Sequence, residues 1–233
     1  MENRSSHKRV IGILIFAIGI LLSAGLTAVL TWANFEAEFY GFHRFTSDRL
    51  SGLTCPLVLT LSETGTIQID IFNSTGKTID PIIRIDTSTH GAADTLQIPL
   101  HLLPGQSEHL KHTINADNVD LGNFIFVKVY RYPSYPLPAA ESTCGTMILD
   151  LPFLNGAQIY LLWLTLCLSA FPLGIWLWSP REDERIFNAA KAAALFALSG
   201  LLLSVQVGWA LGLFCLILTI LLSIVILQQA TPR

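Results

Sequence analysis

Residues 10–33 read VIGILIFAIGILLSAGLTAVLTWA, a run of 24 positions without a charged side chain. A helix needs about 20 mainly apolar residues to cross the hydrocarbon core of a bilayer. Two further uncharged runs follow, at residues 151–180 and 192–232. They help to explain why only 13% of the whole chain is charged, against about 25% in a typical soluble domain. The sequence therefore predicts an integral membrane protein.

The third uncharged run is too long for a single span. Its 41 residues would form a helix of about 60 Å, twice the thickness of the hydrocarbon core. The polar, glycine-containing stretch QVGW at 206–209 is the expected turn, which places helices at 188–205 and 209–228. With spans at 10–33 and 157–178, the prediction is four transmembrane helices.

Basic residues predict the orientation of these spans, because Lys and Arg concentrate on the cytoplasmic side. Half of them lie in or beside the short segments 1–9, 179–187 and 229–233: Arg4, Lys8, Arg9, Arg181, Arg185, Lys191 and Arg233. We therefore expect both termini and the 179–187 loop in the cytoplasm of a cell whose plasma membrane the chain spans, with residues 34–156 outside. A cleaved signal peptide within residues 1–33 is the alternative, although its apolar run is longer than such peptides usually carry.

Two further patterns concern the spans themselves. All five tryptophans fall within one or two turns of a predicted span end, where such rings favour the membrane interface: Trp32, Trp163, Trp176, Trp178 and Trp209. Small residues recur four positions apart, which allows helices to approach closely: Gly19 with Ser23, Ala24 with Ala28, Ala193 with Ala197, and Gly208 with Gly212. Packing within the chain is the first interpretation of these pairs, with chance or contact with another subunit as alternatives.

Between the first two spans the apolar period changes to two. Residues 66–71, TIQIDI, alternate cleanly and are followed by a turn, whereas residues 124–132 are apolar on both faces, as in a central strand. We expect seven short strands, within 56–62, 66–71, 83–86, 96–102, 110–114, 124–132 and 147–149. The predicted fold is an α+β membrane protein with an extracytoplasmic antiparallel β-sandwich at 34–156, inserted between helices 1 and 2.

Residues 96–114, LQIPLHLLPGQSEHLKHTI, contain a strand that ends in a Pro-Gly turn, then a small polar residue and a second alternating strand. This pattern resembles the middle of bacterial surface immunoglobulin-like domains of the CARDB and NEW3 type. The resemblance extends over about residues 55–151. It implies an Ig-like sandwich with an adhesive or accessory role, and it carries over no catalytic residue. The chain as a whole resembles a multi-pass membrane protein.

Cysteines and histidines are the candidate site residues of the outer segment. Cys55 and Cys144 flank the strand set, so a disulfide is predicted, with two free thiols as the alternative. His109 and His112, with Glu108 and His101 nearby, suggest a zinc site. Positions 109 and 112 nevertheless point to opposite faces of a strand. Only His101 and His112 could then converge, without an evident third ligand, so we predict no metal and no cofactor.

The sequon Asn73-Ser74-Thr75 is either a glycan acceptor or a turn, and the turn is the favoured interpretation.

The function follows only at the level of class. The net charge of −3 gives no basic face for nucleic acid, and the spans lack the ionisable groups that transporters place at membrane depth. The sequence predicts a non-enzymatic structural or accessory subunit that lies in membrane lipid and whose sandwich binds another membrane or envelope protein, or the cell envelope. A small subunit of a transport or electron-transfer complex is the alternative. The doubly apolar stretch 124–132 suggests that something covers part of the outer domain.

Overall fold

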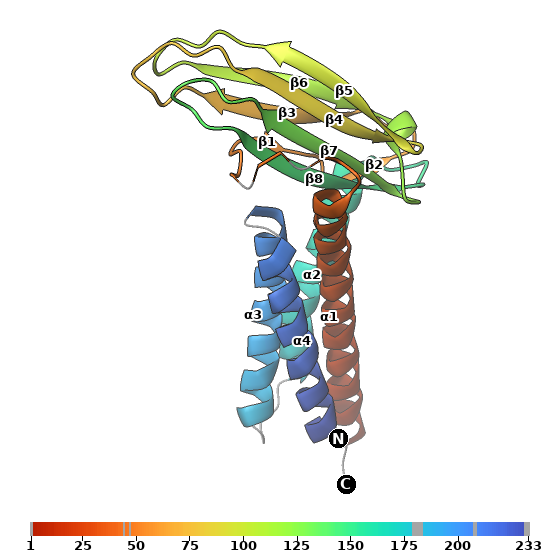
Figure 1. Cartoon of the computed structure of the whole chain (residues 1–233). Helices are drawn as coiled ribbons and strands as arrows, with labels where there is room; N and C mark the ends of the chain where they lie inside the picture. The colour runs from red at the N-terminus through yellow and green to blue at the C-terminus, as the bar shows by residue number, and fades with distance from the viewer. Residues whose placement is uncertain (1, 44, 47, 179–183, 207–208, 231–233) are drawn as a thin grey trace. The chain divides into compact units, whose positions relative to one another are not determined.

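The computed structural model describes residues 2–43, 45–46, 48–178, 184–206 and 209–230. Within them, one helix is followed by eight strands and then by three helices, with a short 3-10 helix (Ala116–Asn118) between the sixth and seventh strands (Figure 1). The chain divides into two compact units, residues 1–32 with 160–233 and residues 33–159. The first unit is helical and the second is built mainly from strands, so the fold is α+β.

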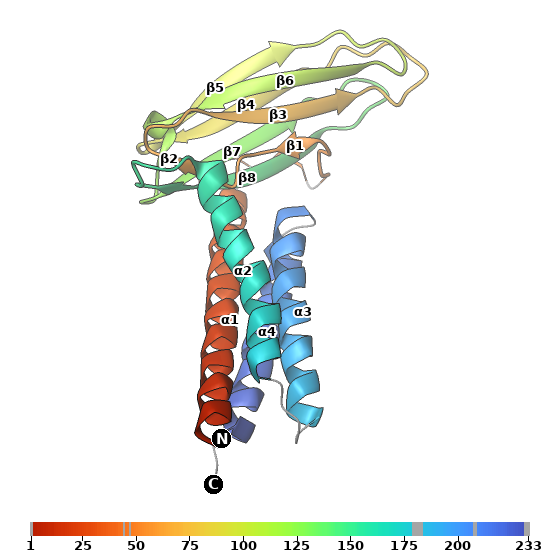
Figure 2. The ribbon, with the colours of Figure 1, turned by 180° about the vertical axis from the view of Figure 1, so that it is seen from behind.

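Four helices in the described part of the chain are long and apolar enough to cross a membrane: α1 (Glu2–Phe39), α2 (Gly156–Trp178), α3 (Glu184–Gln206) and α4 (Trp209–Ala230) (Figure 2). The long third uncharged run is two helices, α3 and α4, as predicted, and positions 207 and 208 lie outside the described residues. Helix α1 extends past the predicted span at both ends, because no Gly or Pro follows residue 33 until Gly41 and none precedes Val10.

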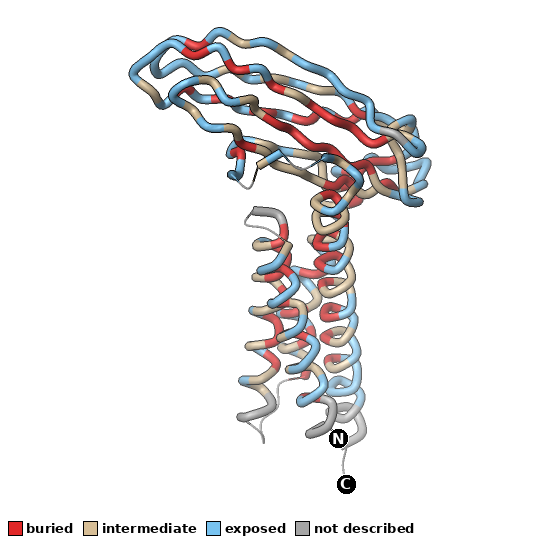
Figure 3. The backbone as a smooth tube through the Cα atoms, in the orientation of Figure 1, coloured by how far each residue is buried: buried red, intermediate tan, exposed pale blue. Residues whose placement is uncertain are grey.

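Glycines allow α1 and α2 to approach closely within the helical unit. A Cβ atom on Gly12 would lie 2.4 Å from the backbone nitrogen of Trp178, and one on Gly174 would lie 2.7 Å from that of Phe16. Beside these contacts the rings of Phe16 and Phe171 pack edge to face, with centroids 5.9 Å apart. Buried residues recur along the helices of this unit (Figure 3), and those of its core cluster come from all four helices.

The second unit contains two sheets. Five strands pair in the order β2-β8-β7-β4-β5 and three in the order β1-β3-β6. All these pairings are antiparallel except that of β2 with β8. The strands are β1 (Leu53–Thr54), β2 (Val58–Thr60), β3 (Gly65–Phe72), β4 (Ile82–Thr89), β5 (Ala92–Pro99), β6 (Ser107–Ile114), β7 (Phe124–Arg131) and β8 (Ala140–Leu149). The described residues thus hold eight strands where the sequence predicted seven, because the two-residue β1 is too short to show an alternating pattern.

The core of the sandwich consists of the alternate apolar side chains that the sequence pattern indicated. On β3, Ile67, Ile69 and Ile71 are buried while the residues between them are exposed. β7 has neighbours on both sides and is buried on both faces, as its doubly apolar sequence predicted. One face of β7 joins the core through Ile125, Val127 and Val129, and the other carries Phe126, Lys128 and Tyr130.

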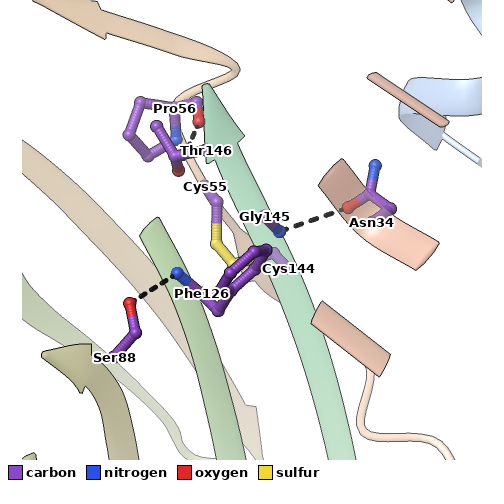
Figure 4. The surroundings of a disulfide bond; sticks show 8 residues. All are labelled: Asn34, Cys55, Pro56, Ser88, Phe126, Cys144, Gly145 and Thr146. Atoms are coloured by element: carbon purple, nitrogen blue, oxygen red, sulfur yellow. Dashed lines mark hydrogen bonds between the residues drawn. A yellow bond between two sulfur atoms is a disulfide. The ribbon is translucent and has the colours of Figure 1, made fainter. Parts of the chain in front are cut away.

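Cys55 and Cys144 form the predicted disulfide, with their Cα atoms 6.4 Å apart (Figure 4). Cys55 follows β1 and Cys144 lies in β8, so the bond joins two places 89 residues apart in the sequence. Next to it, the Thr146 hydroxyl donates to the carbonyl oxygen of Pro56 at 2.8 Å. The segment that leads into β2 is therefore held to β8 by a covalent bond and a hydrogen bond.

Candidate functional site

One end of the sandwich is organised around a single side chain, Asn73. We call it the Asn73 end. It consists of the loops 73–81, 100–106 and 132–139, which the strand registers bring together, and of Phe72, the last residue of β3 before the first loop. Asn73 is 0% exposed. Its Nδ2 donates to the carbonyl oxygens of Lys77, Leu102 and Leu103 at 2.8, 3.0 and 3.1 Å. One side-chain amide therefore joins the first two of these loops.

The surroundings of Asn73 also decide between the two interpretations of its sequon. Its Oδ1 accepts hydrogen bonds from the backbone nitrogen and the hydroxyl of Thr75, at 3.0 and 2.6 Å. Nδ2, the atom that would carry a glycan, is enclosed and already donates to three carbonyl oxygens. In the folded domain the sequon is a turn.

Three large side chains are exposed at the Asn73 end. Phe72 and Leu103 are each 54% exposed and Tyr135 is 81% exposed. Their loops are tied together, because Asn73 joins the first two and the backbone nitrogen of Asp80 donates to the Ser134 hydroxyl at 3.0 Å. The Asn73 end thus presents apolar side chains from loops whose backbones are held in place. Fixed, exposed apolar groups of this kind are typical of contact surfaces.

Two of the histidines considered as metal ligands are exposed and paired with separate carboxylates. His101 Nδ1 lies 2.6 Å from Asp80 Oδ1, and His109 Nδ1 lies 2.6 Å from Asp70 Oδ1. The second pair sits directly across β3 and β6, since Asp70 and His109 are partners in the register. Among the described residues no group of three or more His, Cys, Asp or Glu side chains is placed to hold a metal ion.

His112 faces the interior, on the opposite side of β6 from His109, as the period of two predicted. Its Nε2 lies 3.0 Å from the hydroxyl of Thr87, which belongs to the other sheet. His101 and His112 therefore have different partners, and the convergence considered from the sequence is not formed. Burial lowers the pKa of His112, although the carboxylate of Asp94 opposes this effect.

The outer face of the five-stranded sheet is covered by residues 33–43, 45–46 and 48–49, which we call the connector: the last turns of α1 and the described residues after them. A Cβ atom on Gly145 would lie 2.1 Å from the carbonyl oxygen of Ala33, so the end of α1 lies directly on β8. The Asn34 side chain accepts a hydrogen bond from the backbone nitrogen of Gly145 at 3.4 Å (Figure 4). Any residue with a Cβ atom at position 145 of β8 would prevent this approach, so a glycine is required there.

Tyr40 anchors the next part of the connector. Its ring packs on Phe126 of β7 with centroids 4.8 Å apart, and its hydroxyl donates to the carboxylate of Asp120. Burial, together with the hydrogen bond to Asp120, raises the pKa of Tyr40 to about 12. The same hydrogen bond lowers the pKa of Asp120. Both groups therefore keep at neutral pH the protonation states that this bond requires.

A buried ion pair holds the middle of the connector. The Lys128 side chain is 3% exposed, and its Nζ lies 3.0 Å from Oε2 of Glu141 and donates to the carbonyl oxygen of His43. The Phe45 ring lies 5.1 Å from the same Nζ and stacks on Tyr130 with centroids 4.5 Å apart. A buried lysine is tolerated only when such partners are present. The cover over β7 that the sequence suggested is thus supplied by the chain itself.

The start of α2 is fixed to the sandwich as well. Oε2 of Glu63 accepts a hydrogen bond from the backbone nitrogen of Gly156 at 2.8 Å, and a Cβ atom on Gly156 would lie 2.0 Å from the carbonyl oxygen of Val58. Asn155 and Gln158 cap the helix reciprocally, each side chain accepting from the other's backbone nitrogen, at 2.8 and 3.1 Å. The parts of α1 and α2 that belong to the second unit are therefore both packed against its strands.

The tryptophans predicted for the membrane interface differ in how far they are exposed. Trp32 and Trp176 are 54% and 74% exposed, and Trp209 is partly buried. Trp163 is also partly buried, and its Nε1 donates to a carbonyl oxygen of α1 at 3.0 Å. Trp178 is 4% exposed, and its ring packs in the helical core.

The small residues singled out for helix packing contact neighbouring helices of this chain. A Cβ atom on Gly19 would lie 3.0 Å from an alanine Cβ of α2, and the Ser23 hydroxyl donates to a carbonyl oxygen of α3 at 3.2 Å. Gly212 of α4 lies against a serine of α3, where an added Cβ would come within 2.7 Å. Gly208, its predicted companion, lies outside the described residues.

The roles of three residues on which this arrangement depends were not predicted from the sequence, although Gly145 and Lys128 each left a signal. Asn73 was interpreted as a turn residue without its buried role. Gly145 is a glycine inside a strand, which often marks close backbone approach. Lys128 is a charge in the middle of a doubly apolar run, which indicates a charged partner above the sheet.

No protein-family model matches this chain, and no curated protein matches it. Among solved structures, it is similar to the CARDB domain of a Pyrococcus furiosus protein in complex with di-metal ions. That match has a TM-score of 0.36 and 9% identity, and covers 43% of this chain and 91% of that one. CARDB-type domains, which residues 55–151 resemble in sequence, are thus also represented among the solved structures similar to this chain.

Two enzymes are also among the solved structures similar to this chain. The chain is similar to Bacteroides uniformis β-glucuronidase 2 covalently bound to cyclophellitol-6-carboxylate aziridine, with a TM-score of 0.32 and 14% identity, over 42% of this chain. It is also similar to red sea bream transglutaminase, with a TM-score of 0.33 and 11% identity, over 45% of this chain. The matched segment spans only 13% and 17% of the two enzymes' own lengths. These matches, like the first, are likenesses of fold.

Proposed function

We propose that the chain is a four-span integral membrane protein of the plasma membrane, with both termini in the cytoplasm and residues 34–156 outside. The large apolar side chains that the helices leave uncovered support this proposal. Leu21, Leu195 and Phe214 are 71%, 67% and 58% exposed, and lipid would cover such surface. The disulfide supports an outside location for the sandwich, since disulfides persist in oxidising compartments.

The sidedness can be tested with a cysteine in place of Tyr135, which is 81% exposed in the second unit. In intact cells whose outer barriers admit the reagent, a membrane-impermeant thiol reagent should modify Tyr135→Cys. The parent chain is the matched control, because its two free cysteines are buried in α2 and α4. Modification only after the cells are broken open would place residues 34–156 on the inner side and overturn the proposed orientation.

Within that membrane we propose a non-enzymatic accessory role, in which the Asn73 end of the sandwich binds a protein partner. The observation that carries this proposal is the set of exposed Phe72, Leu103 and Tyr135 side chains on loops held together by buried Asn73. Aromatic residues are enriched at the centres of protein interfaces. Loops that are already ordered lose little conformational entropy when a partner binds.

Site-specific photo-crosslinking in native membranes tests this role. A photoreactive amino acid at Leu103 should give a discrete cross-linked product. Leu121 is the matched control, because it is also an exposed leucine, at 59%, and precedes β7 at the opposite end of the strands. The Phe72→Ser/Tyr135→Ser variant should abolish the Leu103 product and leave the disulfide intact. Identical products at both positions, or none at Leu103, would refute the assignment.

A further inference from the structure

The loop between β8 and α2 carries the most exposed large apolar side chain among the described residues. Phe153 is 93% exposed, and its neighbours Leu151 and Leu154 are 45% and 39% exposed. None of them belongs to the core of the sandwich. Residues 151–158, LPFLNGAQ, include no charged side chain. The loop is thus an uncharged apolar projection, which we call the 151–154 loop.

The 151–154 loop is held in place at both of its ends. Before it, the backbone nitrogen of Ile148 donates to the carbonyl oxygen of Asn123 at 2.8 Å. After it, the reciprocal cap of Asn155 and Gln158 begins α2, and Gly156 is fixed by Glu63. Phe153 therefore stands out from a loop with two anchored ends, and no neighbouring segment covers it.

The distance along the chain from this loop to the membrane is short. Helix α2 has 23 residues and is about 34 Å long, slightly more than the hydrocarbon core of about 30 Å, so its first turn reaches the headgroup layer. That layer is about 5–8 Å deep on each side. Phe153 precedes Gly156 by three residues, a span of at most about 11 Å even when fully extended. Its side chain is therefore within reach of the lipid headgroups.

We propose that the 151–154 loop inserts Leu151, Phe153 and Leu154 into the headgroup layer of the outer leaflet, which makes the phospholipid surface the ligand of this patch. The inference rests on the membrane orientation proposed above. Phe and Leu are among the side chains that proteins bury at the boundary between headgroups and acyl chains. The depth is limited to the interface because the loop is irregular, and its unpaired backbone groups need water or headgroups as partners. Continuity with α2 is what favours lipid over a protein as the occupant.

Three variants, each with a single free cysteine, test the insertion in a chain that keeps its disulfide and whose free Cys167 and Cys215 are replaced by Ala. Phe153→Cys probes the loop, and Tyr135→Cys is the exposed control at the Asn73 end. Leu168→Cys is the lipid control, because it is 49% exposed near the middle of α2. Each full-length variant is labelled with an environment-sensitive fluorophore and reconstituted into phosphatidylcholine–phosphatidylglycerol vesicles. One set of vesicles carries a nitroxide-labelled lipid, and aqueous iodide is added to the other.

We expect the label at 153 to show blue-shifted emission, strong quenching by the nitroxide lipid and several-fold less quenching by iodide than the label at 135. If the label at 153 is quenched by iodide and by the nitroxide lipid to the same extent as the label at 135, while the label at 168 is quenched by the lipid, the insertion is refuted and the four-span proposal stands. If 168 is not quenched by the lipid, the four-span proposal itself fails. Protection of 153 from iodide in native membranes, without lipid quenching in vesicles, would identify a protein occupant and overturn the inference.

Discussion

Replacing Asn73 by Ala should open the Asn73 end of the sandwich. The variant loses two amide hydrogens that are shared among three carbonyl oxygens, and two hydrogen bonds accepted from Thr75. At about 1 kcal/mol each, these four bonds are worth about 4 kcal/mol. The loss is smaller because two of the oxygens keep other donors: Lys77 O accepts from the Thr75 hydroxyl, and Leu102 O accepts from the Ile79 nitrogen. We expect a net destabilisation of about 3 kcal/mol.

Hydrogen exchange of the detergent-solubilised full chain measures this effect where it arises. A local loss of about 3 kcal/mol corresponds to roughly a hundredfold faster exchange of amides that exchange by opening of this region. The amides of β3 and β6 next to the loops are the ones to follow. Ser74→Ala is the control, because the neighbouring Ser74 side chain is exposed. If Asn73→Ala and Ser74→Ala exchange alike, Asn73 does not hold the two loops together and the reasoning is wrong.

An Asn73→Asp variant separates the donor role of the side chain from its shape. The new carboxylate would face the carbonyl oxygens that now accept from Nδ2, so folding would raise its pKa above the unfolded value of about 3.9. A group with a raised carboxyl pKa loses stability as pH rises through the unfolded value. Asn73→Asp should therefore be clearly less stable at pH 7 than at pH 4, relative to the parent chain. A difference that does not vary with pH would contradict the donor role.

Three further perturbations probe the connector and the interior of the sandwich. Gly145→Ala should lower the melting temperature of the full chain by several degrees, because the added Cβ would overlap the α1 backbone. Gly76→Ala is the control and should not lower it, because a Cβ there meets no atom within 4 Å. Equal melting temperatures for the two variants would argue against the close approach. Lys128→Met should lower the free energy of unfolding by about 3 kcal/mol, because it leaves the Glu141 carboxylate buried without its cation. Adding Glu141→Gln to the same chain should recover part of that loss. A double-mutant cycle that gives no coupling energy between the two positions would contradict the ion pair. Because folding lowers the pKa of His112, its protonation favours unfolding, and the stability of the chain should fall as the pH drops below about 6.5. The difference in melting temperature between pH 7 and pH 5 should be smaller for His112→Gln than for the parent chain. An unchanged difference would place the titrating group elsewhere.

Patterns along the chain predicted the elements well wherever one face of an element had to be apolar. The alternation of residues 66–71 marks β3 because its inward isoleucines are buried and the residues between them are exposed. The doubly apolar run 124–132 marks β7 as a central strand because both of its faces are buried. The uncharged run 192–232 divides into α3 and α4 near its polar break. In each case the burial of a face constrains residues that are close together in sequence, so a short window carries the information.

The candidate site could not be predicted in this way, because its contacts join residues that are far apart. Asn34 and Gly145 are 111 positions apart, and Lys128 contacts the carbonyl oxygen of His43 across 85 positions. A period of two states which face of β7 a residue occupies, but it contains no information about what lies above that face. The same holds for Asn73, whose composition indicates a turn while its burial depends on a loop about 30 residues further along.

The contacts that cover the doubly apolar strand β7 change where a partner should be sought. Its low charge suggested that a second molecule covers β7, but Tyr40 and Phe45 of the connector lie on that face and Lys128 is neutralised there by Glu141. That surface is therefore already used within the chain, and a partner would have to displace a buried ion pair to reach it. Phe72 and Leu103 are in the opposite situation. They are half exposed beside loops that Asn73 holds together, and the protein contact proposed above would remove their apolar surface from water.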